Sequence, residues 1–271
     1  MKGLDCMQIR NQPSSDTRLM TWDDTFTFRC HRGIDCYNSC CRDVTIFLNP
    51  FDVARMRKAL GISSTDFLED YTVRVVSDST GIPAVVLKMR EEAEKRCPFV
   101  SDEGCTVYEA RPYSCRLYPL DTDQGVEYRF IVDSRRCHGL NELEEWTVER
   151  WRHDQGLQAY DDIDHQLADV MRANEVWEEP IRDPRMQDMF LMALYDPDRF
   201  RRFVFDSSFL KKFRVDDDIL EMIRDDDAAL LYFAAQWLRF ALFGKKGFLK
   251  IDRDYLDLKK KEVLGTRRTN R

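Results

Sequence analysis

Residues 97–120 read CPFVSDEGCTVYEARPYSCRLYPL, which places three cysteines at short intervals among turn-forming residues. A second stretch, FRCHRGIDCYNSCCR at 28–42, carries four more cysteines, two of them adjacent. Cys137 follows alone in RRCHGLNE. Eight of the nine cysteines therefore fall between Cys30 and Cys137. Short loops of this kind can bring several thiolates to one metal centre. The cysteines are therefore the main evidence for what the first half of the chain does.

Composition limits the class of protein. The chain has 271 residues, 43% of them hydrophobic, so it can bury a sizeable core without disulfides. Its net charge of -7 argues against a surface built for nucleic acid or anionic lipid. We expect no signal peptide and no membrane span, since the N-terminal residues show no signal pattern and no apolar run approaches the roughly 20 residues that span a bilayer. We therefore expect a soluble cytoplasmic protein without membrane insertion or a nucleic-acid partner, and in that reducing compartment cysteines usually serve as metal ligands or redox groups.

The clustered thiolates are predicted to bind metal. The expected ligands are Cys30, Cys36, Cys40, Cys41, Cys97, Cys105, Cys115 and Cys137. A set of sulfur ligands suits an iron–sulfur cluster, of the 4Fe-4S kind, or zinc, and eight thiols exceed what one structural zinc needs. They can fill two four-cysteine sites, or serve one site and leave spares. Inert buried cysteines or a disulfide framework would explain them otherwise, but scattered core cysteines would not gather in one half of the chain. Cys6 lies outside the cluster.

Charged residues and histidines flank these cysteines. The arginines directly beside a cysteine are Arg29, Arg42, Arg96, Arg116 and Arg136. A guanidinium near a thiol lowers its pKa and offsets the negative charge of a thiolate cluster. His31 and His138 each follow a cysteine and are alternative ligands. His153 and His165 stand in polar helical sequence and are expected at the surface.

The fold class predicted is α+β, a small cysteine-rich metal-binding module of short strands and helices followed by a mainly helical C-terminal region. A strand is expected at 44–48, and Asn49, Pro50 and Gly61 mark the ends of a helix. A short helix follows at 66–71. Strands expected at 72–77 and 84–90 form a hairpin. A second strand pair is expected at 97–108, with its turn at 101–104, and a further strand at 126–133.

From Asn141 onward the hydrophobic pattern has a helical period. Two stripes are expected in the core: Met186, Met189, Phe190, Ala193 and Leu194, and Leu230, Phe233, Ala234, Trp237, Leu238 and Ala241, the second ending at Gly244. Asp196 and the run 216–218 are expected helix starts. We divide the chain into an N-terminal segment (1–27), a cysteine-cluster domain (28–140), a helical region (141–258) that can meet a protein partner, and a solvated basic tail (259–271).

The three cysteine stretches, in this order, resemble the YkgJ-type cysteine-cluster family, of the CxxCxxCC type and described as zinc- or iron-chelating. The motifs that carry the resemblance are Cys97-Pro98-Phe99, Gly104-Cys105, Val107-Tyr108-Glu109, Arg111-Pro112, Cys115-Arg116 and Tyr118-Pro119. The first stretch departs from the family, which usually has tighter gaps than the five and three residues found before the adjacent pair. The resemblance implies a bound metal ion or cluster, and we take Arg111 and Arg116 as candidates for contacts to that cofactor.

Two other functions stay open. Flagellin lysine methylases look like relatives of this family, which implies a protein-lysine N-methyltransferase. The chain has no GxGxxG loop and only 11 glycines, so the usual cradle for a nucleotide-like cofactor is hard to build. A thiol redox sensor is the third reading, because thiols flanked by arginine are reactive. The sequence assigns no catalytic residue and leaves open whether the protein is an enzyme.

Overall fold

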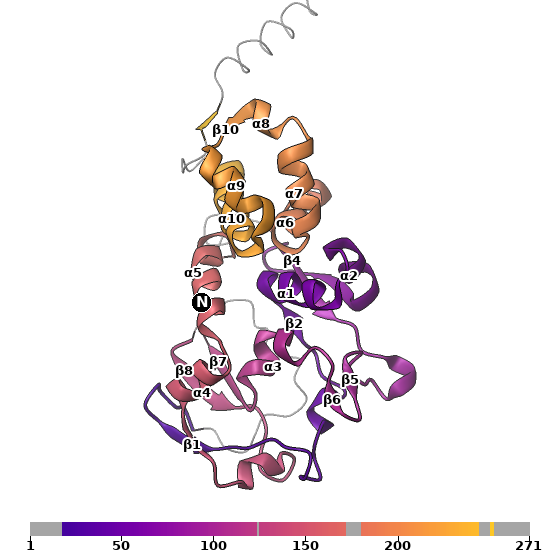
Figure 1. The fold of residues 1–271 in the computed structure, drawn as a ribbon, viewed down its shortest axis with the longest axis vertical. Coiled ribbons are helices and arrows are strands. Elements are labelled where there is room, and N and C mark those ends of the chain that lie inside the picture. The colour runs from indigo at the N-terminus through magenta and orange to yellow at the C-terminus, as the bar shows by residue number, and fades with distance from the viewer. Residues whose placement is uncertain (1–17, 124, 172–179, 244–249, 252–271) are drawn as a thin grey trace, which may run out of the picture.

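The computed structural model describes residues 18–123, 125–171, 180–243 and 250–251 (Figure 1). Its helices are α1 (Pro50–Leu60), α2 (Ser64–Tyr71), α3 (Tyr113–Leu117), α4 (Val148–Asp154), α5 (Gln158–Met171), α6 (Pro184–Tyr195), α7 (Pro197–Asp206), α8 (Phe209–Lys212), α9 (Asp217–Asp225) and α10 (Asp227–Phe243). Four short 3-10 helices are η1 (Ser39–Cys41), η2 (Glu91–Ala93), η3 (Tyr108–Ala110) and η4 (His138–Asn141).

The strands are short and form small sheets. They are β1 (Thr25–Thr27), β2 (Phe47–Leu48), β3 (Thr72–Val76), β4 (Pro83–Leu87), β5 (Val100–Ser101), β6 (Gly104–Cys105), β7 (Leu120–Asp123), β8 (Glu127–Phe130), β9 (Glu145–Thr147), β10 (Phe213–Arg214) and β11 (Lys250–Ile251). Helices α6 to α10 lie at one end of the molecule and the small sheets of β1 and β5 to β8 at the other (Figure 1). This arrangement confirms the predicted α+β class.

Helix α1 begins and ends where the sequence predicts. The Asn49 side chain accepts from the Asp52 backbone N–H at 2.7 Å, and the Asp52 carboxylate accepts from the Asn49 N–H at 2.9 Å. This reciprocal pair is a capping box. Gly61 ends the helix with a φ of 68°, a left-handed conformation that is cheap without a Cβ. The buried Asp52 also accepts from the Tyr113 N–H at 2.8 Å, which ties the start of α3 to the first turn of α1.

The predicted hairpin forms, and it gains a third strand. β3 and β4 pair in antiparallel register from Thr72 opposite Leu87 to Val76 opposite Pro83. β2 pairs with the other edge of β4, so the sheet order is β2-β4-β3. β2 is shorter than the strand predicted at 44–48. One further bond follows outside β2, where the N–H of Leu87, the last residue of β4, donates to the Ile46 carbonyl at 2.9 Å.

The other small sheets combine predicted and unpredicted strands. β5 and β6 form the expected pair with its turn between Ser101 and Gly104. β8 lies inside the strand predicted at 126–133, and its partner β7 was not predicted. β1 pairs with β9, which joins Phe26 to Trp146 across most of the first half of the chain. Strands of three residues carry too little sequence pattern to predict a pairing between such distant segments.

The helical second half follows the predicted stripes. α6 carries the first stripe, in which Phe190, Ala193 and Leu194 are buried. α10 carries the second, buried except at Ala241, which is exposed. Asp196 caps α7 and Asp216 is the N-cap position of α9, as predicted. Gly244, Cys6 and the basic tail lie outside the described residues.

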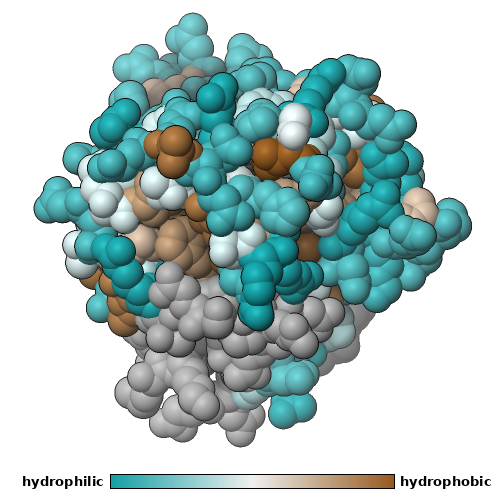
Figure 2. All heavy atoms as spheres, turned by 90° about the horizontal axis from the view of Figure 1, so that it is seen from below, coloured by the Kyte–Doolittle hydropathy of each residue, from teal (hydrophilic) through white to brown (hydrophobic). Residues whose placement is uncertain are grey.

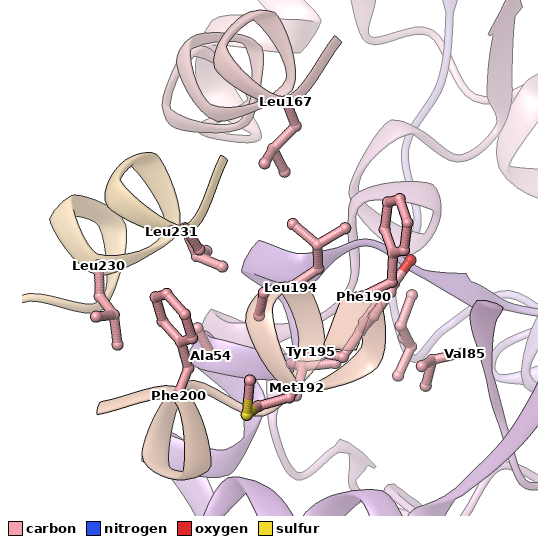
Figure 3. Close-up of a cluster of buried hydrophobic side chains, with 14 of the residues drawn as sticks. Ala54, Val85, Leu167, Phe190, Met192, Leu194, Tyr195, Phe200, Leu230 and Leu231 are labelled. Carbon is pink, nitrogen blue, oxygen red and sulfur yellow. The ribbon is translucent and has the colours of Figure 1, made fainter. Parts of the chain in front are cut away.

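Two hydrophobic cores form, and each draws on distant segments. The large core joins α1, α2 and the β2-β4-β3 sheet to α5, α6, α7 and α10. Figure 3 shows its centre, where Phe190 and Leu194 of α6 lie among side chains from the neighbouring elements. It therefore contains residues from both sides of position 140.

The small core is mainly aromatic and lies among the strands at the opposite end. Its buried residues are Met20, Phe26, Phe28, Leu117, Leu120, Tyr128, Cys137, Val148, Trp151, Leu157 and Tyr160. Trp151 makes edge-to-face contacts with Phe26, Phe28 and Trp146 at centroid distances of 5.2 to 6.2 Å. Such contacts give a small core more stabilisation than its area alone.

The face at the end that carries the small sheets is mainly hydrophilic (Figure 2). Seen from the end that carries the small sheets, hydrophobic residues stand as separate small patches between charged and polar ones (Figure 2). No helix among the described residues combines the length and apolar character needed to cross a bilayer. His153 and His165 are exposed, as predicted.

Candidate metal centre

All eight predicted ligand cysteines fall among the described residues, and none of them forms a disulfide. Cys97 and Cys137 are buried, Cys30 and Cys40 are exposed, and the others are intermediate. The disulfide framework considered from the sequence is therefore not formed by these eight cysteines. Their sulfur atoms remain available as thiolate ligands.

The first cysteine stretch is a chain of tight turns docked on the second. The Cys36 carbonyl accepts from the Ser39 N–H at 2.9 Å, and the Asn38 carbonyl accepts from the Cys41 N–H at 3.1 Å. Asn38 adopts a left-handed φ of 64°, which asparagine tolerates better than most residues. Its side-chain amide donates to the Ser101 carbonyl at 3.2 Å. This bond fixes the adjacent pair Cys40 and Cys41 beside the β5-β6 hairpin.

The second stretch folds back so that its cysteines come near Cys41. The Cys97 N–H donates to the Cys41 carbonyl at 2.8 Å. The chain then turns, with the Val100 N–H donating to the Cys97 carbonyl at 3.3 Å, and Val100 pairs with Cys105 across the hairpin. Cys115 follows in α3 and packs against the same large core as Cys41, Cys97 and Cys105.

The last cysteine stretch meets the start of the first. The His138 N–H donates to the Cys36 sulfur at 3.2 Å. The Arg29 N–H donates to the Gly139 carbonyl at 3.0 Å, which places Cys30 beside the segment that carries Cys137. A Cβ added to Gly139 would stand 2.8 Å from the Arg29 carbonyl oxygen, so this close approach requires glycine.

Burial dominates the protonation of these thiols. It raises the pKa of Cys30 and of Cys97 to about 11, and it also raises the pKa of Cys105, Cys115 and Cys137. The thiols add to this effect by opposing one another's ionisation. The exception is Cys41, whose pKa is lowered because the Cys40 thiol donates a hydrogen bond to its sulfur. A nearby cation is therefore needed to keep most of the set ionised near neutral pH.

The arginines that act on the thiols are largely not the ones adjacent in sequence. Burial raises the pKa of Cys30 and Cys105, and the nearby Arg111 guanidinium opposes this effect. At Cys41 the hydrogen bond from Cys40 lowers the pKa most, and Arg111 lowers it further. Arg96, one of the predicted five, has the same effect on Cys41. Arg90, which was not among the predicted arginines, lies near Cys97 and opposes the rise in its pKa that burial causes. Arg111 thus lies close to thiols from both cysteine stretches.

The other predicted arginines make different contacts. Arg29 lies 3.7 Å from the Glu144 carboxylate and Arg42 lies 2.5 Å from that of Glu94, at exposed positions. Arg136 is exposed. The buried Arg116 guanidinium donates to three backbone carbonyls, those of Glu109, Arg111 at 3.0 Å and Gln155 at 2.8 Å. Arg116 therefore holds the loop before α3 against the end of α4.

The contacts of the two histidines differ from a ligand role for their rings. His31 Nδ1 accepts from the Gly33 N–H at 3.1 Å, and its Nε2 lies 3.5 Å from the Glu142 carboxylate. His138 contacts Cys36 through its backbone N–H, as the first residue of η4. Sulfur thus makes up the donor set that the described residues gather.

One residue at the site was missed as a candidate from the sequence. The Tyr118 hydroxyl hydrogen-bonds the Cys137 thiol, and Tyr118 also lies near Cys36 and Cys40. Its pKa is raised by burial first and by this bond second. The signal that could have found it is its place in the Tyr-Pro step of the family motif, which we used only for the resemblance.

The thiols gather without forming a site for a single ion. Across the described ranges, no three Cys, His, Asp or Glu side chains stand close enough to hold one metal ion together. The donor chemistry itself, eight sulfur atoms with a guanidinium nearby, fits iron or zinc. Binding of such a group would draw the turns inward, since metal binding in cysteine-rich modules is coupled to folding.

The comparison with known families agrees with the donor chemistry. Residues 29–138 match the CxxCxxCC family model, described as "Putative zinc- or iron-chelating domain". The match confirms the resemblance found from the motifs and supports metal binding by this part of the chain. No curated protein and no solved structure matches the chain.

Proposed function

We propose that the zinc- or iron-chelating domain at 29–138 holds iron as an iron–sulfur cluster through its cysteine thiolates. The observation that carries this proposal is a gathering of eight thiols that form no disulfide, several of which oppose one another's ionisation and three of which have the Arg111 guanidinium nearby. Thiolate ligands are the usual attachment of such clusters.

The number of thiols favours a cluster over a single zinc ion. Two sulfurs bound to one zinc at about 2.3 Å stand about 4 Å apart, and four of them enclose the ion tightly. A four-iron cube carries its thiolates on separate iron corners, so they stand further apart. The eight thiols exceed the four that one structural zinc ion binds, which favours the larger group.

Metal and sulfide analysis tests the proposal. The full chain would be purified without oxygen and its iron, zinc and acid-labile sulfide measured, with optical spectra and EPR after reduction. We expect iron and sulfide in equal amounts. Zinc without sulfide would keep the thiolate site and reject the cluster, and material that binds neither metal after reconstitution would reject the proposal altogether.

Replacement of Arg111 should alter the properties of the cluster. Reduction adds negative charge, and the Arg111 guanidinium favours the negative form of nearby thiols. We expect Arg111→Gln to lower the midpoint potential of the cluster and to shorten its lifetime in air. Arg136→Gln is the matched control, because Arg136 adjoins Cys137 in sequence but is exposed. Equal midpoint potentials in the two variants would show that Arg111 does not contact the cluster site.

A further inference from the structure

We propose that the free edge of strand β3 pairs with β3 of a second copy of this chain, so that the two β2-β4-β3 sheets join into one continuous sheet. The pairing is antiparallel and places a twofold axis at Val75, as in the closed symmetric dimers that are common among soluble proteins. This interface uses none of the cysteines and does not depend on the proposed metal binding.

The backbone of β3 presents hydrogen-bonding groups on its free side. β3 is the last strand in the order β2-β4-β3. Directly after it, the Ser77 N–H donates to the Ile82 carbonyl at 3.1 Å, so the odd-numbered residues here bond toward β4. Alternate residues of an antiparallel strand bond to opposite sides, so the N–H and C=O groups of Arg74 and Val76 point away from β4. Within the described part of the chain, no strand and no backbone group bonds to them there.

The side chains of β3 leave this edge unprotected. Val73, Val75 and Val76 are 46%, 38% and 40% exposed, on a strand of only five residues. Natural proteins usually protect an edge strand with proline, lysine or a bulge. β3 contains no proline or lysine, and its register with β4 runs unbroken through all five residues. An exposed apolar edge of this kind is a template for another strand.

One face of the sheet is also open beside this edge. Val85 of β4 is buried in the large core. The opposite face carries Val73 and Val75, with the half-buried Val86 and Ala84 across from them. A second sheet joined at the edge of β3 would give these two exposed valines apolar neighbours on their free side.

The sequence of β3 favours a second copy as the partner. An axis at Val75 sets the two Val75 side chains directly opposite each other and pairs the outward groups of Arg74 with those of Val76 in the copy. An axis at Arg74 would instead oppose two like charges. With the axis at Val75, Arg74 lies diagonal to Asp78 of the copy, an opposite charge. The other diagonal neighbour is the copy's Arg74, and the Asp188 carboxylate near each Arg74 offsets that repulsion.

Sedimentation velocity of the full chain over a range of concentrations measures the association. A reductant in the buffer prevents disulfides between copies from contributing. We expect a dimer that dissociates on dilution, and Val75→Lys should raise its dissociation constant by about tenfold or more, because two like charges then lie directly opposite. Val126→Lys is the matched control, since Val126 is 62% exposed but lies beside β8, in a different sheet.

A charge swap tests the position of the axis. Val75→Glu alone should also weaken the dimer. An equimolar mixture of the Val75→Lys and Val75→Glu proteins should form a heterodimer, because an axis at this residue sets lysine opposite glutamate. A further variant, Val76→Pro, removes an N–H that points away from β4 without breaking a bond to β4, and it should weaken the dimer as well.

Several results would overturn the proposal. A wild type that stays monomeric at every concentration would reject the pairing of two copies. Dimers that withstand both Val75→Lys and Val76→Pro would place the interface elsewhere on the molecule, and a mixture that remains monomeric would reject the axis at Val75. Far-UV circular dichroism identifies any variant that fails to fold, and the wild-type measurement decides whether a dimer exists without variants.

Discussion

Removal of the bound metal is expected to loosen residues 28–120 and to lower the melting temperature of the protein by roughly 10 °C, which corresponds to about 4 kcal/mol of linked stability. The cysteine stretches have little regular structure of their own. They consist of tight turns, two-residue strands and the five-residue helix α3. Without a bound cation, burial keeps these thiols protonated. They would then no longer be held together by a common metal centre, and the loops that carry them would lose contacts with one another.

The measurement is a thermal melt combined with amide hydrogen exchange, before and after removal of the metal by a chelator with an oxidant. Exchange should quicken at Cys97, whose N–H donates to the Cys41 carbonyl, and at Cys105 on the β5-β6 hairpin. Amides of α6 near Phe190 provide an internal control, since that helix is buried in the large core. An unchanged melting temperature with unchanged protection of the hairpin would show that the fold does not depend on metal.

Asp227→Ala should destabilise the protein by about 2 to 4 kcal/mol, because it leaves two largely buried guanidiniums without a main partner. Asp227 pairs with Arg57 of α1 and, at 2.7 Å, with Arg201 of α7. The three side chains are 13%, 17% and 20% exposed, respectively, so water screens them little. Asp198 takes part in the same network, 3.2 Å from Arg57 and 3.3 Å from Arg201.

Denaturant unfolding of the two variants Asp227→Ala and Asp188→Ala measures this effect. Asp188 makes the control pair, since it lies 2.6 Å from Arg199 but both side chains are more than 40% exposed. An exposed pair of this kind contributes about 1 kcal/mol or less. Equal losses in the two variants would mean that the network between α1, α7 and α10 carries no special stabilisation.

Local signals predicted the elements whose causes are local. Asn49, Pro50 and Gly61 mark the ends of α1 by capping and turn chemistry that involve residues within four positions. The hairpin of β3 and β4 and the stripe of α6 are likewise set by near neighbours and by hydrophobic period. The short strands β1, β7 and β9 could not be predicted, because their partners, and not their own residues, make them strands.

The arginines illustrate the same limit at the site. Adjacency in sequence pointed to Arg29, Arg42, Arg116 and Arg136, whose side chains lie in surface pairs, at an exposed position or among backbone carbonyls. Neighbours along a backbone often point in different directions, so adjacency is a weak guide to side-chain contact. The influence of Arg111 on three thiols follows from the folding of its loop over both cysteine stretches.

The amino-acid sequence by itself determined that this chain concentrates thiols in a stretch that matches a family of zinc- or iron-chelating domains and follows it with amphipathic helices, because residue type and spacing are properties of the sequence alone. Tertiary structure alone decided which thiols become neighbours, and it joined residues before position 140 to helices after it in one core. The physical reason is that such contacts depend on how distant segments pack. The free energy of these contacts is distributed over many side chains, so no single stretch of sequence contains a signal for them.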